Sequence, residues 1–194
     1  MYEKSNALYK FCYHCAPVIL GIKPSNTMVL AEKELELIKE CLKNTEIDLY
    51  TLGNSGEKKF VMAYRDSLLK QRLNDFEVVP YMEKMGYSEK TVIGKLERLK
   101  ARYEYYCCNK RDFPHEIGVF LNYPIQDIID YQQKGTRQCI LSGYWQVFSN
   151  KEKAERIFQQ YDCARNILIG SLKNGFTFSE IYHMVQGKSL TKSE

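Results

Sequence analysis

The sequence contains little proline, little histidine and no long run of apolar residues. Its 194 residues include five prolines, three histidines and one tryptophan. The longest apolar run is far shorter than the roughly 20 residues of a membrane-spanning helix, and the first residues lack the basic start and apolar stretch of a signal peptide. We therefore expect a cytoplasmic chain that does not enter a membrane.

Neither sign of charge dominates the chain. The 28 basic and 24 acidic residues leave a net charge of +4, which is too small to indicate a nucleic-acid partner by itself. The local exception is residues 95–111, with six basic side chains and the aromatic Tyr103, Tyr105 and Tyr106. Tyr103 and Tyr106 fall on the apolar stripe of a predicted helix, whose opposite face carries the charges, as is typical of a solvated amphipathic helix. The pattern argues against nucleic-acid binding.

Seven cysteines in a chain without a signal peptide indicate reduced thiols, and an odd number cannot all be paired. The spacing Cys12-Tyr13-His14-Cys15 matches a dithiol redox motif, but such a motif needs a strand before its first cysteine, whereas a helix is predicted there. The adjacent pair Cys107-Cys108 lacks the spacing of zinc ligands. We expect no metal site, and the sequence leaves any cofactor open.

The composition predicts one globular domain over residues 1–187, followed by a frayed tail over residues 188–194, because 44% of the residues are hydrophobic and no linker interrupts the chain. Short apolar and aromatic runs predict strands at 27–30, 47–52 and 60–64, and a strand pair or bent strand within 137–148. Helical spacing predicts most of the remaining elements. The expected fold class is therefore α+β or irregular α/β, with a small sheet packed by several helices.

Four expected element boundaries rest on single residues. Pro17 is predicted to open a short second helix after a first one over residues 3–13. Ser88 is expected to cap a long helix, Ser149 to form a capping box with Glu152, and a last helix to follow Ser179.

The segment 113–124 is the most informative part of the sequence, because His115 and Glu116 stand side by side at the start of an apolar stretch with a glycine and two prolines. Cys15 gains interest if Pro17 begins a helix, because free amide groups would then stabilise a thiolate. A nucleophilic site could combine Cys15 with His115 as base and Glu116 as the residue that orients it. The alternative is a buried, inert cysteine and a histidine in a structural turn.

Four further residues are candidates for ligand contacts. Trp145 could stack on a planar ligand or anchor the core. Lys23, with Asn26 beside it in the same loop, could meet an anion or remain solvated, and Arg65 is a second candidate for an anion contact.

Several segments together form a pattern that covers nearly the whole chain. They are Ala16-Pro17 to Gly21, Lys23, Asn26, Tyr64-Arg65, Gly86-Tyr87, Phe113-Pro114-His115-Glu116-Ile117-Gly118, Phe120-Leu121, Tyr123-Pro124 and Gly143-Tyr144-Trp145-Gln146-Val147-Phe148. In these segments the sequence resembles a family of bacterial proteins, mostly from clostridia and related Firmicutes, that is known as a domain of unknown function. In this chain Asn122 stands where the family usually has glycine, and Phe148 where tyrosine is common. The resemblance implies a cytosolic single-domain protein and singles out Lys23, His115 and Trp145, together with Glu116, for testing.

These observations lead to three hypotheses. The first is a small-ligand-binding or accessory protein with a pocket near His115, Glu116 and Trp145. The second is a thiol-dependent hydrolase or transferase that uses Cys15 and His115. The third is an interaction protein in which segment 113–124 is a structural turn. The sequence does not decide whether the protein is an enzyme, and it leaves the oligomeric state open.

Overall fold

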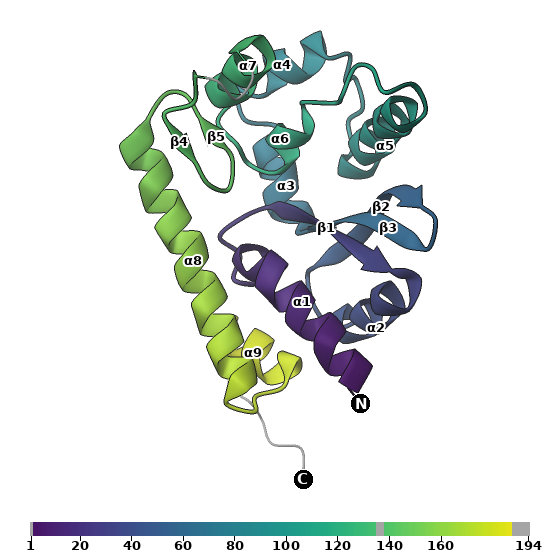
Figure 1. Cartoon of the computed structure of the whole chain (residues 1–194), viewed down its shortest axis with the longest axis vertical. Coiled ribbons are helices and arrows are strands. Elements are labelled where there is room, and N and C mark those ends of the chain that lie inside the picture. The colour runs from purple at the N-terminus through teal and green to yellow at the C-terminus, as the bar shows by residue number, and fades with distance from the viewer. Residues whose placement is uncertain (1, 135–137, 188–194) are drawn as a thin grey trace.

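The computed structural model describes residues 2–134 and 138–187 and shows helices on both sides of a small sheet (Figure 1). The elements in chain order are α1 (Tyr2–Ile19), β1 (Ser25–Ala31), α2 (Glu32–Leu42), β2 (Asp48–Ser55), β3 (Lys58–Tyr64), α3 (Asp66–Leu73), α4 (Val79–Lys84), α5 (Val92–Asn109), α6 (Ile117–Phe120), α7 (Ile125–Lys134), β4 (Leu141–Ser142), β5 (Gln146–Val147), α8 (Lys151–Lys173) and α9 (Phe178–Val185).

The main sheet has three antiparallel strands in the order β1-β3-β2. The predicted hairpin is confirmed as β2 and β3, which are joined by a turn in which Gly56 has a φ of +58°. The register shifts between Thr51 and Gly53, so that Gly53 lies opposite Phe60. The ring of Tyr103 from α5 covers Gly53, where an added Cβ would lie 2.8 Å from the ring, so glycine is needed for α5 to approach the sheet.

Alternate residues of the strands face two different hydrophobic clusters. On one face Met28, Leu30 and Val61 pack with α1, α2, α8 and α9. On the other face Met62 and Phe60 pack with α3 to α7. A third, smaller cluster joins the β4-β5 hairpin to α8. The architecture is α+β in a single domain, as the sequence predicts.

Helix α1 continues through Pro17, so the predicted second helix starting at Cys15 and Pro17 is wrong. Proline removes the helical hydrogen bond to the carbonyl four residues before it, that of Tyr13, and its ring crowds that carbonyl. In the same turn, the side chain of Asn26 donates to the carbonyl of His14 at 2.6 Å. Val18 and Ile19 are fully buried, so their packing favours a continuous helix over the local preference of proline.

Two other helix starts differ from expectation. Thr91, not Ser88, caps α5, because its hydroxyl accepts from the amide of Gly94 at 3.1 Å. Asn150 caps α8, since the hydroxyl of Ser149 donates instead to Asp127.

The last helix begins at Phe178, before the predicted position, because Thr177 caps it in a capping box with Glu180. The predicted frayed tail, residues 188–194, lies outside the described residues, as does the first part of the predicted strand pair at residue 137. Within the described ranges, no helix is both long enough and apolar enough to span a membrane.

Candidate ligand-binding cavity

A tight turn before α6 sends His115 and Glu116 to different surroundings. The amide of His115 donates to the carbonyl of Phe113 at 2.8 Å, and the carbonyl of His115 accepts from Gly118 at 3.0 Å. The side chain of His115 lines a cavity, whereas that of Glu116 is 1% exposed and lies in the interior. His115 and Glu116, although neighbours in the sequence, therefore cannot contact the same ligand in this cavity.

The carboxylate of Glu116 is fully engaged by two other elements. It pairs with the guanidinium of Arg102 on α5 and accepts from the hydroxyl of Tyr87 at 3.0 Å. Burial and this carboxylate raise the pKa of Tyr87, which keeps its hydroxyl protonated as a donor. Glu116 thus ties α6 to α5 and to the segment before it, and its position gives it a structural role.

His115 is half-buried between two aromatic rings. Its ring centroid lies 5.1 Å from that of Phe113 and 5.5 Å from that of Tyr131. No described residue forms a hydrogen bond with its imidazole. Burial lowers the pKa of His115, with Glu116 opposing the shift, so the imidazole is neutral at pH 7. A neutral imidazole offers a ligand one donor and one acceptor.

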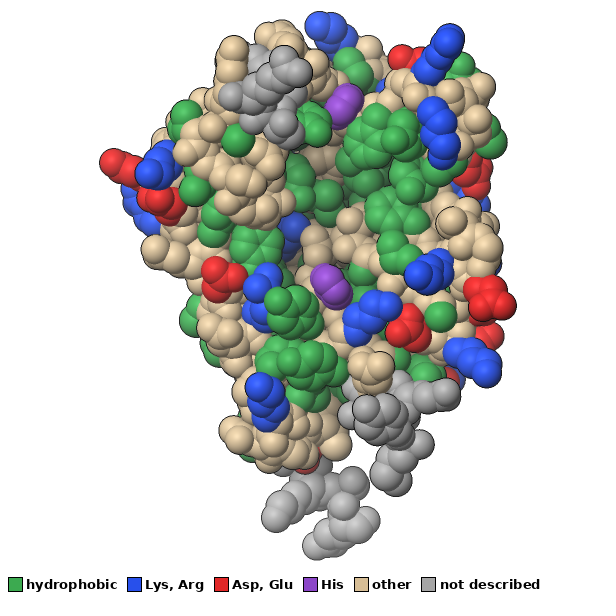
Figure 2. Space-filling model, viewed as in Figure 1, with side chains coloured by type: hydrophobic (Ala, Val, Ile, Leu, Met, Phe, Trp, Pro, Cys, Tyr) green, Lys and Arg blue, Asp and Glu red, His purple; other side chains and the backbone are tan. Residues whose placement is uncertain are grey.

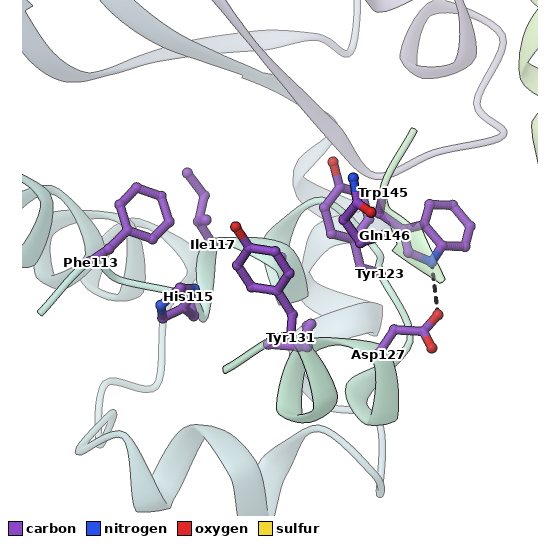
Figure 3. Close-up of a pocket in the computed structure, with 10 residues that line it drawn as sticks. Phe113, His115, Ile117, Tyr123, Asp127, Tyr131, Trp145 and Gln146 are labelled. Atoms are coloured by element: carbon purple, nitrogen blue, oxygen red, sulfur yellow. Dashed lines mark hydrogen bonds between the residues drawn. The ribbon is translucent and has the colours of Figure 1, made fainter. Parts of the chain in front are cut away.

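The cavity has a volume of about 290 Å³ and mostly aromatic and aliphatic walls (Figure 3). Figure 3 shows Phe113 and His115 at one end, Tyr123, Gln146 and Trp145 at the other, and Tyr131 between them. Gly118 forms part of the wall, and an added Cβ there would lie 3.0 Å from Ile128 and 3.1 Å from Tyr123. The absence of a side chain at Gly118 keeps these walls close together.

Trp145 is held in place by Asp127 of α7. Its indole nitrogen donates to one carboxylate oxygen of Asp127 at 2.8 Å. The other oxygen accepts from the amides of Phe148 and Ser149 and from the hydroxyl of Ser149, at 2.9 to 3.1 Å. Trp145 also stacks on Tyr123 at 5.3 Å between ring centroids. Asp127 therefore fixes one wall of the cavity and leaves Trp145 no indole donor for a ligand.

Asn122, directly before the cavity residue Tyr123, has a left-handed backbone conformation. Its φ is +61°, a conformation that glycine adopts without strain and that asparagine tolerates better than most residues. The positive φ turns the chain so that Tyr123 can reach the cavity.

Lys23 is buried behind this wall. Its ammonium lies 5.6 Å from the centroid of Tyr123 and 5.5 Å from that of Tyr161, and it donates to the side chain of Asn26 at 2.8 Å. Burial lowers the pKa of Lys23 to about 8, and the thiol of Cys15 opposes part of this shift. The structure thus brings Lys23, Asn26 and, through Tyr123, Trp145 together, although Lys23 itself does not line the cavity.

Arg65 lies at the end of α1. It donates to the carbonyls of Val18 and Ile19 at 2.7 Å and to the carboxylate of Glu46 at 2.9 Å. These bonds satisfy carbonyls that a helix end leaves free. Arg65 is 4% exposed and does not line the cavity, so its geometry is that of a helix cap.

Cys15 is fully buried in the first hydrophobic cluster, with its sulfur 3.8 Å from that of Met28. Because α1 is continuous, the thiol lies far along the helix from its free amide groups. Burial raises the pKa of Cys15 to about 12, with Lys23 opposing the shift. Cys15 does not line the cavity of His115, so the structure does not bring these two residues to one site.

Cys12 is also buried, and burial raises the pKa of its thiol. Both cysteines of the CxxC spacing lie within α1, in a setting unlike that of a dithiol redox motif. All seven cysteines are free. Among the described residues, no three His, Cys, Asp or Glu side chains gather as metal ligands would.

Three residues of the cavity wall, Asp127, Tyr131 and Gln146, belong to no candidate site that the sequence predicts. Asp127 and Tyr131 are four residues apart on α7, so helical spacing from the cavity side could have suggested them. Gln146 follows Trp145 in the motif and was passed over in favour of its aromatic neighbour.

Residues 11–182 match the protein family described as "Protein of unknown function (DUF3793)". The chain belongs to this family. No curated protein and no solved structure matched the chain. Membership in DUF3793 assigns no activity, so the argument for a function rests on the cavity itself.

Proposed function

We propose that this DUF3793 protein binds a small, planar, mostly apolar ligand in the cavity between α6, α7 and β5. The observation that carries the proposal is the imidazole of His115, which lies in an aromatic cavity without a hydrogen bond to any described residue. A polar group at such a position suits a ligand with a matching donor or acceptor.

The dimensions and walls define the class of ligand. A volume of about 290 Å³ lies at the lower end of ligand cavities, which suits a compound of one or two fused rings. Aromatic rings on several sides favour a flat ligand by stacking. His115 supplies one polar contact, and the hydroxyl of Tyr131, which has no hydrogen bond to a described residue, supplies a second.

Trp145 allows a direct test, because it is the one tryptophan in the chain and it lines the cavity. We would titrate the protein with purine and with benzimidazole and follow tryptophan emission. Saturable quenching by either probe is expected, and it should be lost in His115→Ala. The matched control is His14→Ala, which removes an exposed histidine outside the cavity wall.

Free N-acetyltryptophanamide, titrated in parallel, corrects for collisional quenching. If neither probe quenches Trp145 beyond this reference, or if both histidine variants behave alike, the proposal is wrong.

The second hypothesis, a thiol-dependent hydrolase or transferase using Cys15 and His115, has no such support. The burial of Cys15 and its raised pKa disfavour a thiolate. Alkylation of the folded, reduced protein, mapped by mass spectrometry, distinguishes the two. Exposed Cys108 and Cys163 should react, while Cys15 stays unmodified. Selective reaction of Cys15 at neutral pH would revive the thiol hypothesis.

We also propose a cytoplasmic location in a bacterium of the Firmicutes. The resemblance of the motifs supports the origin, and seven free cysteines fit a reducing compartment. Fractionation of a native host with an antibody against the chain tests the location.

A further inference from the structure

Helix α5 leaves the hydrophobic core halfway along its length. Its buried residues are Val92, Leu96 and Leu99, and no residue from 101 to 109 is buried. The sequence pattern assigns Tyr103 and Tyr106 to the core, but both are only half-buried. The basic and aromatic end of α5 therefore lies at the edge of the core, where both rings are partly accessible to solvent.

These two tyrosines belong to a continuous series of rings on the surface, which we call the aromatic row. Neighbouring centroids along it are 4.8, 6.3, 5.0, 5.1 and 5.5 Å apart. No ring in the row is fully buried. The row consists, in spatial order, of Phe60, Tyr103, Tyr106, Phe113, His115 and Tyr131.

The row is fixed at both ends. At one end Phe60 belongs to the sheet, and Tyr103 rests on Gly53 opposite it. At the other end Phe113, His115 and Tyr131 line the cavity. Figure 2 shows hydrophobic side chains gathered on this face, beside a hollow, with basic side chains along their outer edge.

Positive charges accompany the row. The ammonium of Lys110 lies 5.9 Å from the centroid of Tyr106, and Arg111 is exposed two residues before Phe113. Neither forms an ion pair with a carboxylate among the described residues. Lys58, exposed on β3, shares a strand face with Phe60 because side chains alternate along a strand. Cations thus stand near the Phe60 end and beside the middle of the row.

We propose that the aromatic row binds single-stranded nucleic acid, with one base in the cavity and the following bases on the half-buried rings that continue the row. Aromatic rings beside a positively charged path are the means by which proteins bind unpaired strands, because every base has a face that can stack. A duplex hides those faces, and an apolar peptide would gain nothing from the flanking cations. This inference rests on the proposed function in one respect: the base at one end of the bound strand occupies the ligand cavity.

The test is fluorescence anisotropy with a labelled single-stranded RNA of about 12 nucleotides, a length within the usual site sizes of such proteins. Binding should weaken as salt rises, since the strand releases bound counterions. Tyr106→Ala should weaken binding about tenfold or more, the effect of losing one stacked base. Tyr105→Ala is the matched control, because Tyr105 is exposed on the same helix but lies outside the row.

Charge is tested by Lys110→Glu/Arg111→Glu, which should weaken binding at least tenfold and reduce its salt dependence. The control, Lys39→Glu/Lys43→Glu, changes the net charge equally at exposed positions at the C-terminal end of α2, which packs on the other face of the sheet. Circular dichroism confirms that each variant is folded.

Equal binding of a duplex of the same sequence, equal effects of the two tyrosine variants, or no binding at low salt would overturn the inference. If purine still quenches Trp145 while the RNA does not bind, the ligand cavity stands and the nucleic-acid surface is wrong. If neither purine nor benzimidazole binds but the RNA does so through Tyr106 and Lys110, the row stands and the cavity proposal fails.

Discussion

The end of α1 and the cavity near α6 both contain polar residues that the sequence marks as candidates for a functional site. The two regions differ in whether those residues already have hydrogen-bond partners within the protein. At the end of α1, Arg65 has partners for its donors and Cys15 is sealed in the core. At the cavity, His115 has aromatic neighbours and no hydrogen bond to a described residue. Polar groups with all partners supplied hold the fold, whereas a polar group without them is available to a ligand.

The largest effect should come from Arg65→Met. It leaves the carbonyl of Ile19 without a partner in a buried place, which costs about 1–3 kcal/mol, while the carbonyl of Val18 loses one donor and keeps the amide of Gly21. The free energy of unfolding in urea should fall by about 2–3 kcal/mol. Glu46→Gln is the control, because the Glu46 side chain is 72% exposed and its loss should cost less than about 1 kcal/mol. A similar loss for both variants would mean that the ion pair, not the helix cap, matters.

Asp127→Asn should have the next largest effect. The amide that replaces one oxygen faces donors instead of accepting from them, so the free energy of unfolding should fall by about 2 kcal/mol. The emission of Trp145 should shift as its indole loses an acceptor. Asp162→Asn, on the exposed face of α8, should change neither quantity much. An unchanged emission spectrum of Trp145 in Asp127→Asn would contradict the role of Asp127 in holding Trp145 at the cavity wall.

Lys23 stands between the two regions, and its pKa of about 8 predicts a pH effect. Between about pH 8 and pH 10.5, the unfolded chain keeps a proton on Lys23 that the folded chain releases. The contribution of Lys23 to the free energy of unfolding should therefore rise with pH in this window, by up to about 1.4 kcal/mol per pH unit. At neutral pH the buried charge weakens the fold.

Lys23→Met should remove this rise, so the difference in stability between wild type and variant should change by about 1–2 kcal/mol between about pH 7.5 and pH 9.5. Lys39→Met, at an exposed position, should track the wild type. Parallel curves for wild type and Lys23→Met would show that Lys23 titrates normally.

His115→Ala should change stability least, by about 1 kcal/mol or less, because its half-buried imidazole has no hydrogen bond to a described residue. The same variant should abolish probe binding. Its lowered pKa also predicts that wild-type binding is constant near neutral pH and falls in acid, below the ordinary value of 6.5, once the imidazole is protonated. A large loss of stability in His115→Ala would show that His115, like Arg65, serves to hold the fold together.

Much of the fold could be predicted from local patterns. Apolar and aromatic runs predicted the three strands of the main sheet, and helical spacing predicted most of the helices, because these signals come from which residues of each element are buried. The predicted helix boundaries were wrong where a residue distant in the chain changed the hydrogen bonding or packing at the end of the helix. Asn26 and the core stabilise α1 through Pro17, and Asp127 takes the hydroxyl of Ser149 that was expected to cap α8.

For the candidate site, the sequence picked out His115 and Trp145, and both line the cavity. It also picked out Glu116, Arg65 and Cys15, which lie elsewhere, since residue type does not reveal which partners a side chain meets. The aromatic row was missed for the same reason. Phe60 is far from Tyr103 in the chain, and only the packing of α5 on β2 and β3 brings their rings together.

Local sequence patterns predicted an α+β or irregular α/β domain with a small sheet, and they located the segment that builds the cavity, because burial patterns and turn residues act over short distances. Which polar groups have hydrogen-bond partners depends on the tertiary structure and could not be predicted. Hydrogen bonds such as those of Arg65 with α1 and of Asp127 with the hairpin join residues that are distant in the chain. These bonds occupy the donors of Arg65 and the acceptors of Asp127, whereas the imidazole of His115 remains available to a ligand in the cavity.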